Sequence, residues 1–379
     1  MDDPLAGLTV GYDIPARPGM SEAEVATPCL LVDLDAFERN LMAMRDYAAA
    51  KGVALRVHGK MHKTPAVALR QMDIGGAIGV CCQKVAEAEA FLRGGVTNIL
   101  VSNQIRDPAR IDRLAQLAGQ GHLSVCIDDI ANVAELSQAV VRHGTSLDVL
   151  VEIDCGQGRC GVPPGAPVLT LAQAVAAAGL RFAGLQIYHG NAQHVADPDT
   201  RAAILSGVVD MARDTMTLLA DHDLACETVT GAGTGSFPVE AASGVYTELQ
   251  CGSYAFMDVA YGATPPLEDA PRFDHALFVA AQVMSTAGTG IAVLDAGHKA
   301  AAIDSGPPVV WGDPEAEVQS ISDEHCVIAD PEGRYRVGDR LRLVPGHCDP
   351  TCNLHDWLVG VRGGVVEVLW PVTARGKGY

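Results

Sequence analysis

The stretch ALRVHGKMHKTPAVALRQMDIGGAIGVCC at residues 54–82 contains the unit from which the fold is built. Two short apolar runs, at 54–60 and 77–82, flank an amphipathic segment. The same alternation recurs along the chain and gives eight strand candidates, at 29–33, 54–60, 77–82, 98–103, 122–128, 147–154, 182–190 and 226–233. Such alternation predicts parallel strands joined by crossover helices. Eight units fit a closed (β/α)8 barrel of the TIM type, with an open doubly wound sheet as the alternative.

The pattern changes near residue 265. The segment GATPPLEDAPRFDH at 262–275 is proline-rich and reads as a linker, and alternating apolar runs with turn residues follow it. We therefore expect three parts. They are an N-terminal segment at 1–24 packed on the core, a barrel at 25–265, and a smaller β-rich C-terminal domain at 266–379.

The charge balance excludes some classes of partner. The 379 residues include 27 Lys and Arg against 46 Asp and Glu, a net charge of −19, which argues against nucleic acid and offers no basic patch to anionic lipid. We find neither a signal-peptide pattern nor a run of about 18 apolar residues. The 11 cysteines are scattered through apolar stretches, so we expect reduced thiols in a cytoplasmic protein.

The first apolar run of the opening unit ends in a lysine. Because side chains alternate along a strand, Arg56, His58 and Lys60 share the face that points into the barrel. Lys60 should lie at the C-terminal end of its strand, where such barrels have active sites, and Lys63 should be more exposed. Neighbouring cations would depress the pKa of Lys60 and suit it to a carbonyl cofactor such as pyridoxal 5′-phosphate. A structural, salt-bridged lysine is the alternative.

Two glycine-rich turns could receive the phosphate of that cofactor. TGAGTGS at 230–236 follows a strand, with Thr234 and Ser236 offering hydroxyls, and QCGSYAF at 250–256 follows the next strand. Loops after the last two strands of a barrel often bind phosphate.

The C-terminal domain holds the cluster VPGHCDPTCNLHDW at 344–357. In an extended segment, residues two apart point the same way, so His347 and Asp349 could chelate one hard divalent ion, Mn²⁺ or Mg²⁺, completed by water. A zinc site formed by Cys348, Cys352 and His355, or turn residues with buried thiols, are the alternatives.

Six motifs together resemble the D-threonine aldolase family, fold-type III pyridoxal-phosphate enzymes with an alanine-racemase-like barrel. They are HGKMHK, GVCCQKVAEAEAF, GQGRCG, GLQIYHGNAQH, ELQCGSYAFMD and VPGHCDPTCNLHDW. The resemblance covers nearly the whole chain and implies that Lys60 carries the cofactor, that His347 and Asp349 bind the metal, and that His194 is the catalytic base. It also implies a homodimer. The implied cofactor contacts are Lys60, Gln83, Arg159, Tyr188, Thr234, Gly252, Ser253 and Tyr254.

The resemblance implies a retro-aldol reaction that cleaves a D-3-hydroxy amino acid to glycine and an aldehyde. The ends of the chain most resemble the branch that cleaves 3-hydroxy-D-aspartate to glycine and glyoxylate. D-threonine aldolase, a D-serine or 3-hydroxyaspartate dehydratase, an amino-acid racemase and a non-enzymatic cofactor-binding protein are the alternatives. Asp349, where dehydratases of the superfamily have cysteine, favours the aldolase. Ala232 and His298 depart from the family pattern. Candidate partners for a substrate β-carboxylate are His189, His298, Lys299 and Arg375.

Overall fold

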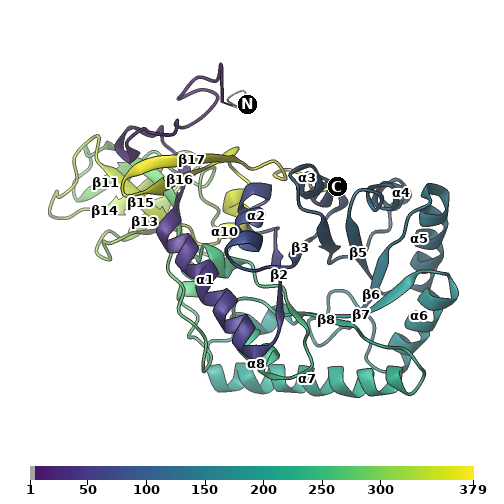
Figure 1. The fold of residues 1–379 in the computed structure, drawn as a ribbon. Coiled ribbons are helices and arrows are strands. Elements are labelled where there is room, and N and C mark those ends of the chain that lie inside the picture. The colour runs from purple at the N-terminus through teal and green to yellow at the C-terminus, as the bar shows by residue number, and fades with distance from the viewer. Residues whose placement is uncertain (1–4) are drawn as a thin grey trace.

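The computed structural model describes residues 5–379 and contains the expected closed barrel (Figure 1). Eight parallel strands form it, and the last pairs with the first. They are β2 (Ala54–His58), β3 (Gly79–Cys82), β4 (Asn98–Val101), β5 (His122–Ile127), β6 (Asp148–Glu152), β7 (Arg181–Ile187), β8 (Thr228–Gly231) and β9 (Glu248–Leu249). The fold class predicted from the sequence is confirmed.

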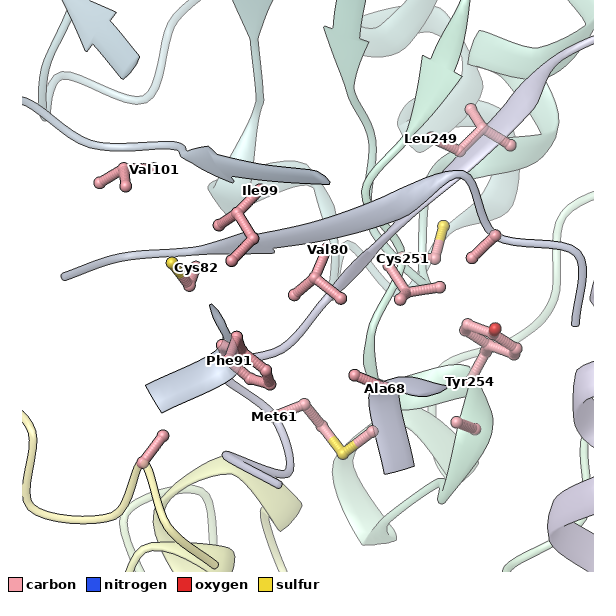
Figure 2. Packing of buried hydrophobic residues seen from close by; sticks show 14 of the residues in the cluster. Met61, Ala68, Val80, Cys82, Phe91, Ile99, Val101, Leu249, Cys251 and Tyr254 are labelled. Carbon is pink, nitrogen blue, oxygen red and sulfur yellow. The ribbon is translucent and has the colours of Figure 1, made fainter. Parts of the chain in front are cut away.

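Seven helices follow the first seven barrel strands and cover the barrel from outside. They are α2 (Pro65–Asp73), α3 (Val85–Arg93), α4 (Pro108–Leu117), α5 (Ile130–His143), α6 (Ala166–Ala177), α7 (Pro198–Ala220) and α8 (Phe237–Ala242). Aspartates cap three of them, since Asp107, Asp129 and Asp197 accept backbone N–H groups at the starts of α4, α5 and α7. Apolar side chains such as Val80 and Ile99 pack outward against these helices (Figure 2).

One strand assignment is wrong. Residues 29–33 form β1 (Cys29–Asp33), which lies in the second sheet between antiparallel β10 (Leu277–Ser285) and parallel β16 (Trp357–Arg362). The barrel is closed by β9 instead. A continuous apolar run marks a strand buried on both faces but does not say which sheet holds it. Helix α1 (Leu34–Lys51) then returns the chain from this sheet to the barrel.

The second domain is a nine-stranded mixed sheet in the order β13-β14-β11-β10-β1-β16-β17, with β15 pairing β10 and β12 pairing β15. The remaining strands are β11 (Ile291–Leu294), β12 (Val309–Val310), β13 (Val318–Ile321), β14 (Cys326–Ala329), β15 (Arg340–Val344) and β17 (Val365–Pro371). Between β15 and β16, the short helix α10 (Cys348–Cys352) approaches the barrel.

The N-terminal segment packs on the second sheet. Ile14 and Ala16 are buried in one cluster with Leu31, Phe278 and Val359. Residues 1–4 lie outside the described part of the chain. Within the described part, no helix is both long and apolar enough to cross a membrane, and all 11 cysteines are free thiols.

A buried ion pair lies inside the barrel. Arg56 donates from Nε to Glu248 at 2.7 Å and from Nη2 at 2.8 Å, and both side chains are almost fully buried. Glu248→Ala leaves the guanidinium charge without its carboxylate, so we expect a loss of about 3–5 kcal/mol in the free energy of unfolding. Chemical denaturation measures it. The double variant Arg56→Met/Glu248→Leu removes both charges and should lose less, whereas equal losses would contradict this explanation.

Candidate active site

A cavity of about 250 Å³ opens at the C-terminal ends of the barrel strands. Seven of the residues expected around the cofactor line it, namely Lys60, Gln83, Arg159, Tyr188, Thr234, Gly252 and Ser253. Asp349 of the second domain reaches the same cavity. The barrel and the β-rich domain therefore meet here within one chain.

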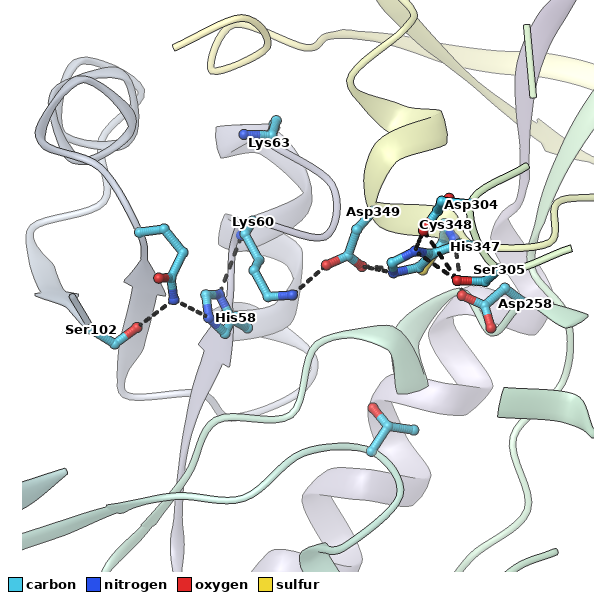
Figure 3. Close-up of polar contacts among 12 residues, drawn as sticks. His58, Lys60, Lys63, Ser102, Asp258, Asp304, Ser305, His347, Cys348 and Asp349 are labelled. Atoms are coloured by element: carbon cyan, nitrogen blue, oxygen red, sulfur yellow. Dashed lines mark hydrogen bonds and ion pairs between the residues drawn. The ribbon is translucent and has the colours of Figure 1, made fainter. Parts of the chain in front are cut away.

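The Lys60 amine lies in this cavity and donates to Asp349 Oδ2 at 2.6 Å (Figure 3). Burial alone would lower the pKa of Lys60, but the adjacent carboxylate outweighs burial and raises it. Burial alone would raise the pKa of Asp349, and Lys60 outweighs burial and lowers it to about 2. The expectation of a depressed lysine pKa is therefore wrong for the protein without cofactor, because a carboxylate neighbours the amine.

The other basic groups of the motif do not surround Lys60 with charge. Arg56 points down the barrel to Glu248, and Lys63 is paired with Glu87. Burial lowers the pKa of His62 to about 4, so this ring is neutral. Lys63 has a side-chain exposure of 16%, against 42% for Lys60, so the expectation that Lys63 is the more exposed lysine is also wrong.

Side chains on neighbouring strands hold the barrel wall of the cavity. The Gln83 amide lies 3.0 Å from His58 Nε2 and donates to Ser102 Oγ at 3.1 Å. Burial lowers the pKa of His58 well below its ordinary value, so the ring is neutral. The Arg159 guanidinium, which also lines the cavity, lies over the Tyr188 ring at 5.7 Å. These groups can bind the face and edges of a flat polar ring.

The two glycine-rich turns follow the seventh and eighth barrel strands, as predicted. In residues 5–379, the backbone N–H groups of Thr234, Gly252 and Ser253 donate to no protein acceptor. Unpaired N–H groups at one rim are the chemistry of an anion site, so the cradle fits a phosphate. Ala232, which departs from the family pattern, lies at a φ of 67°, a conformation that favours glycine, so the backbone of this alanine is strained.

Ser236 stabilises the first glycine-rich turn by hydrogen bonds and does not line the cavity. It is fully buried, and its hydroxyl accepts from Gly233 N–H at 3.0 Å and from the Gln193 amide at 2.9 Å. The same hydroxyl donates to Glu240 Oε2 at 2.7 Å. The hydroxyl expected to bind phosphate thus supports the loop.

Glu240 should make stability depend on pH. Burial raises its pKa from 4.5 to about 8. Between pH 4.5 and about 8 the carboxyl group of Glu240 is ionised in the unfolded chain but still protonated in the folded chain. The stabilisation that Glu240 gives the folded state is therefore full below pH 4.5 and is lost as the pH rises to about 8. Relative to Glu240→Gln, the wild type should lose on the order of 2–5 kcal/mol of unfolding free energy across this window. The free energy of unfolding is measured against pH for each protein, with the exposed Glu332→Gln as control. Parallel curves for wild type and Glu240→Gln would refute the raised pKa of Glu240.

The predicted metal pair is brought together, but not by an extended segment. His347 caps α10 and Asp349 lies in its first turn, with His347 Nε2 and Asp349 Oδ1 3.8 Å apart. Asp304 Oδ2 lies 2.7 Å from the other ring nitrogen of His347, Nδ1. A carboxylate behind a histidine is the usual outer support of a metal ligand, so the pair fits a divalent ion that takes its other ligands from water or substrate.

The zinc alternative is not supported by the positions of its residues. His355 Nε2 lies 2.7 Å from the Ala300 carbonyl, while Cys348 and Cys352 are buried. In the described residues, no group of three or more His, Cys, Asp and Glu side chains is arranged to hold a metal. A site with His347 and Asp349 therefore needs non-protein ligands.

Besides His347, two predicted residues do not line the cavity. His194 lies at its edge, with its ring 4.7 Å from that of Tyr261, and Tyr261 does line the cavity. The Tyr254 side chain packs against Phe273 in the core, and only its backbone N–H contacts Thr234, at 3.1 Å. The Tyr254 side chain therefore faces the core, and a cofactor contact by this residue stays a prediction.

Sequence reasoning missed three supporting residues. Asp304 holds His347, Tyr261 packs on His194, and buried Asp258 accepts from the N–H groups of Cys348 and Tyr261, each at 2.9 Å. Asp258 ends the quoted motif ELQCGSYAFMD, which could have marked it. Asp304 lies in an unremarkable loop, and nothing in the sequence pointed to it.

None of the candidate β-carboxylate partners lines this cavity. Lys299 pairs with Glu324 at 2.7 Å, His298 with Asp323 at 2.8 Å, and Arg375 with Asp356. His189 is buried, and its ring accepts the N–H of Ala192. Among residues 5–379, the cationic side chains that do line the cavity are Lys60 and Arg159.

Comparison with known proteins agrees with this geometry. Residues 32–260 match the alanine racemase N-terminal domain family, and residues 276–361 match a serine dehydratase domain. A 3-hydroxy-D-aspartate aldolase of Paracoccus denitrificans (strain Pd 1222) is 53% identical over 99% of this chain and 98% of its own length. A D-threonine aldolase of Arthrobacter sp. is 49% identical over 96% of each chain.

A solved structure is similar over the same extent. The crystal structure of D-threonine aldolase from Filomicrobium marinum superposes with a TM-score of 0.94 at 51% identity, covering 96% of this chain and 100% of that chain. The chain therefore belongs to the D-threonine aldolase family and is a carbon–carbon lyase with an alanine-racemase-type barrel.

Proposed function

We propose that the protein cleaves a D-3-hydroxy amino acid to glycine and an aldehyde, and that 3-hydroxy-D-aspartate, which gives glycine and glyoxylate, is its preferred substrate. One observation carries the proposal. Asp349 lines the same cavity as Lys60, 2.6 Å from its amine, and His347 lies 3.8 Å behind Asp349, so the cofactor lysine and the metal pair are neighbours. A substrate held at Lys60 would place its β-hydroxyl beside that pair.

Pyridoxal 5′-phosphate bound through Lys60 would supply an electron sink for the carbanion that cleavage leaves at Cα. Gln83, Arg159 and Tyr188 line the space around Lys60 and would orient the ring. The free N–H groups of Thr234, Gly252 and Ser253 would hold the phosphate.

A divalent cation, Mn²⁺ or Mg²⁺, bound to His347 and Asp349 would lower the pKa of the substrate β-hydroxyl. His194 would remove the proton from that hydroxyl. Burial lowers the pKa of His194 below 6.5, and Asp258 only partly offsets burial, so the ring is neutral and can accept a proton at neutral pH. Asp349 is a hard oxygen ligand, which supports hydroxyl deprotonation over the elimination catalysed by dehydratases.

The preference for 3-hydroxy-D-aspartate is supported by the higher identity to the aldolase that acts on it. Steady-state assays with 3-hydroxy-D-aspartate and D-threonine test this preference. We expect the higher kcat/KM for 3-hydroxy-D-aspartate, and a clear preference for D-threonine would overturn the narrower assignment. A homodimer and a cytoplasmic location remain predictions.

A further inference from the structure

Helix α7 carries a buried guanidinium near the active-site cavity. Arg201 is the largest fully buried side chain in the described part of the protein, and no carboxylate there forms an ion pair with it. Its Nε also lacks a hydrogen-bond partner. Burying an unpaired cation destabilises the fold, so the position calls for a reason other than stability.

The remaining Arg201 donors join two loops. Nη1 donates to the carbonyl of Val195 at 2.9 Å, and Nη2 donates to the carbonyl of Pro265. Val195 directly follows His194, and Pro265 directly follows Thr264. One planar guanidinium therefore fixes the residues that follow His194 and Thr264 relative to each other.

His194 and Thr264 are themselves in contact. The Thr264 hydroxyl donates to the Ala260 carbonyl at 2.9 Å, so it can only accept from His194 Nδ1, 3.3 Å away. The proton of the neutral ring is thus held on Nδ1, and Nε2 keeps its lone pair. Tyr261 packs on the same ring and limits its rotation.

We propose that Arg201 is a positioning residue for His194, because it clamps the two loops whose contact sets the tautomer and the place of that ring. This inference rests on the proposed function, in which His194 takes the proton from the β-hydroxyl. Arg201 itself would touch neither substrate nor cofactor. Its loss should therefore impair proton removal at the β-oxygen and spare the chemistry at Cα.

The experiment compares two reactions of the cofactor-loaded, metal-loaded enzyme. The first is cleavage of 3-hydroxy-D-aspartate, or of D-threonine if that is the better substrate. The second is exchange of the glycine α-hydrogen with D₂O, followed by NMR, in which a proton leaves Cα and a deuteron replaces it without any β-oxygen. Arg201→Gln should lower kcat for cleavage by about 10-fold or more, a part of the roughly 10²–10⁴-fold contribution of a general base. KM and glycine exchange should change by less than about twofold.

A double-variant cycle tests the route of the effect. If Arg201 acts through His194, Arg201→Gln should cost almost nothing further in a His194→Ala background. Arg213→Gln, an exposed arginine on the same helix, is the matched control and should behave as wild type. Arg201→Lys keeps the charge but has a single nitrogen in place of the planar fork that reaches both carbonyls, and it serves if Arg201→Gln does not fold. It should show a smaller, selective loss of cleavage.

Equal loss of both reactions, an additive effect in the His194→Ala background, or full cleavage by Arg201→Lys would overturn the inference. Failure of the proposed function gives a different result. The wild type would then exchange glycine but cleave no D-3-hydroxy amino acid, whatever stands at position 201.

Discussion

Lys60→Ala should abolish both cofactor attachment and cleavage, with a fall in kcat of at least about 10³-fold. Lys60 has the one amine that lines the cavity in the described residues, so no nearby lysine can replace it. Lys63, the nearest in sequence, is held by Glu87. The wild-type enzyme should be trapped with its cofactor by borohydride and show a single adduct on the peptide that contains Lys60.

Lys51→Ala is the matched control, because Lys51 ends helix α1 before the start of β2, at the end of that strand opposite to Lys60, and its loss should change neither adduct nor rate. Lys60→Ala also leaves the nearly buried Asp349 carboxylate without its amine, so the melting temperature is recorded to show that the variant still folds. A borohydride adduct on any other lysine, or near-normal turnover by Lys60→Ala, would remove the basis of the proposed chemistry.

Asp349→Asn should lose the divalent cation and at least about 100-fold in kcat. The carboxylate is the oxygen donor of the proposed pair, and an amide binds a hard cation more weakly. Asp304→Asn serves as a milder comparison, because it changes only the carboxylate that contacts Nδ1 of His347. It should cost about 10–100-fold in metal affinity or activity. Metal content per chain after dialysis and the rate in excess Mn²⁺ measure both effects.

Because Asp349 also pairs with Lys60, cofactor absorbance must be recorded for each variant. A loss of metal with retained cofactor assigns Asp349 to the cation. Full metal content and full activity in Asp349→Asn would show that the cation binds elsewhere.

The sequence predicted the barrel and the place of Lys60 because both depend on local periodicity. Strand parity puts Arg56 and His58 on the face that points into the barrel, and Lys60 lies in the turn that follows β2, where it lines the cavity. The sequence could not predict that β1 belongs to the second sheet, because its partners β10 and β16 lie some 250 residues or more further along the chain and such pairing leaves no local pattern. For the same reason Asp304 was missed as the support of His347.

The electrostatics of the site could not be read from sequence neighbours. The motif around Lys60 is rich in cations, yet in space the nearest charged group is Asp349, 289 residues away along the chain. Burial keeps His58 and His62 neutral. The sign of a pKa shift follows from contacts in three dimensions, and the motif shows the cations near Lys60 in the chain but neither Asp349 nor the burial.

The most direct measurement is the product balance of the purified enzyme, supplied with pyridoxal 5′-phosphate and Mn²⁺ and incubated with 3-hydroxy-D-aspartate. If Lys60, His194, His347 and Asp349 work as proposed, glycine and glyoxylate should form in equal amounts, and a chelator should stop both. Ammonia and a keto acid as the main products, with little glycine, would contradict the account.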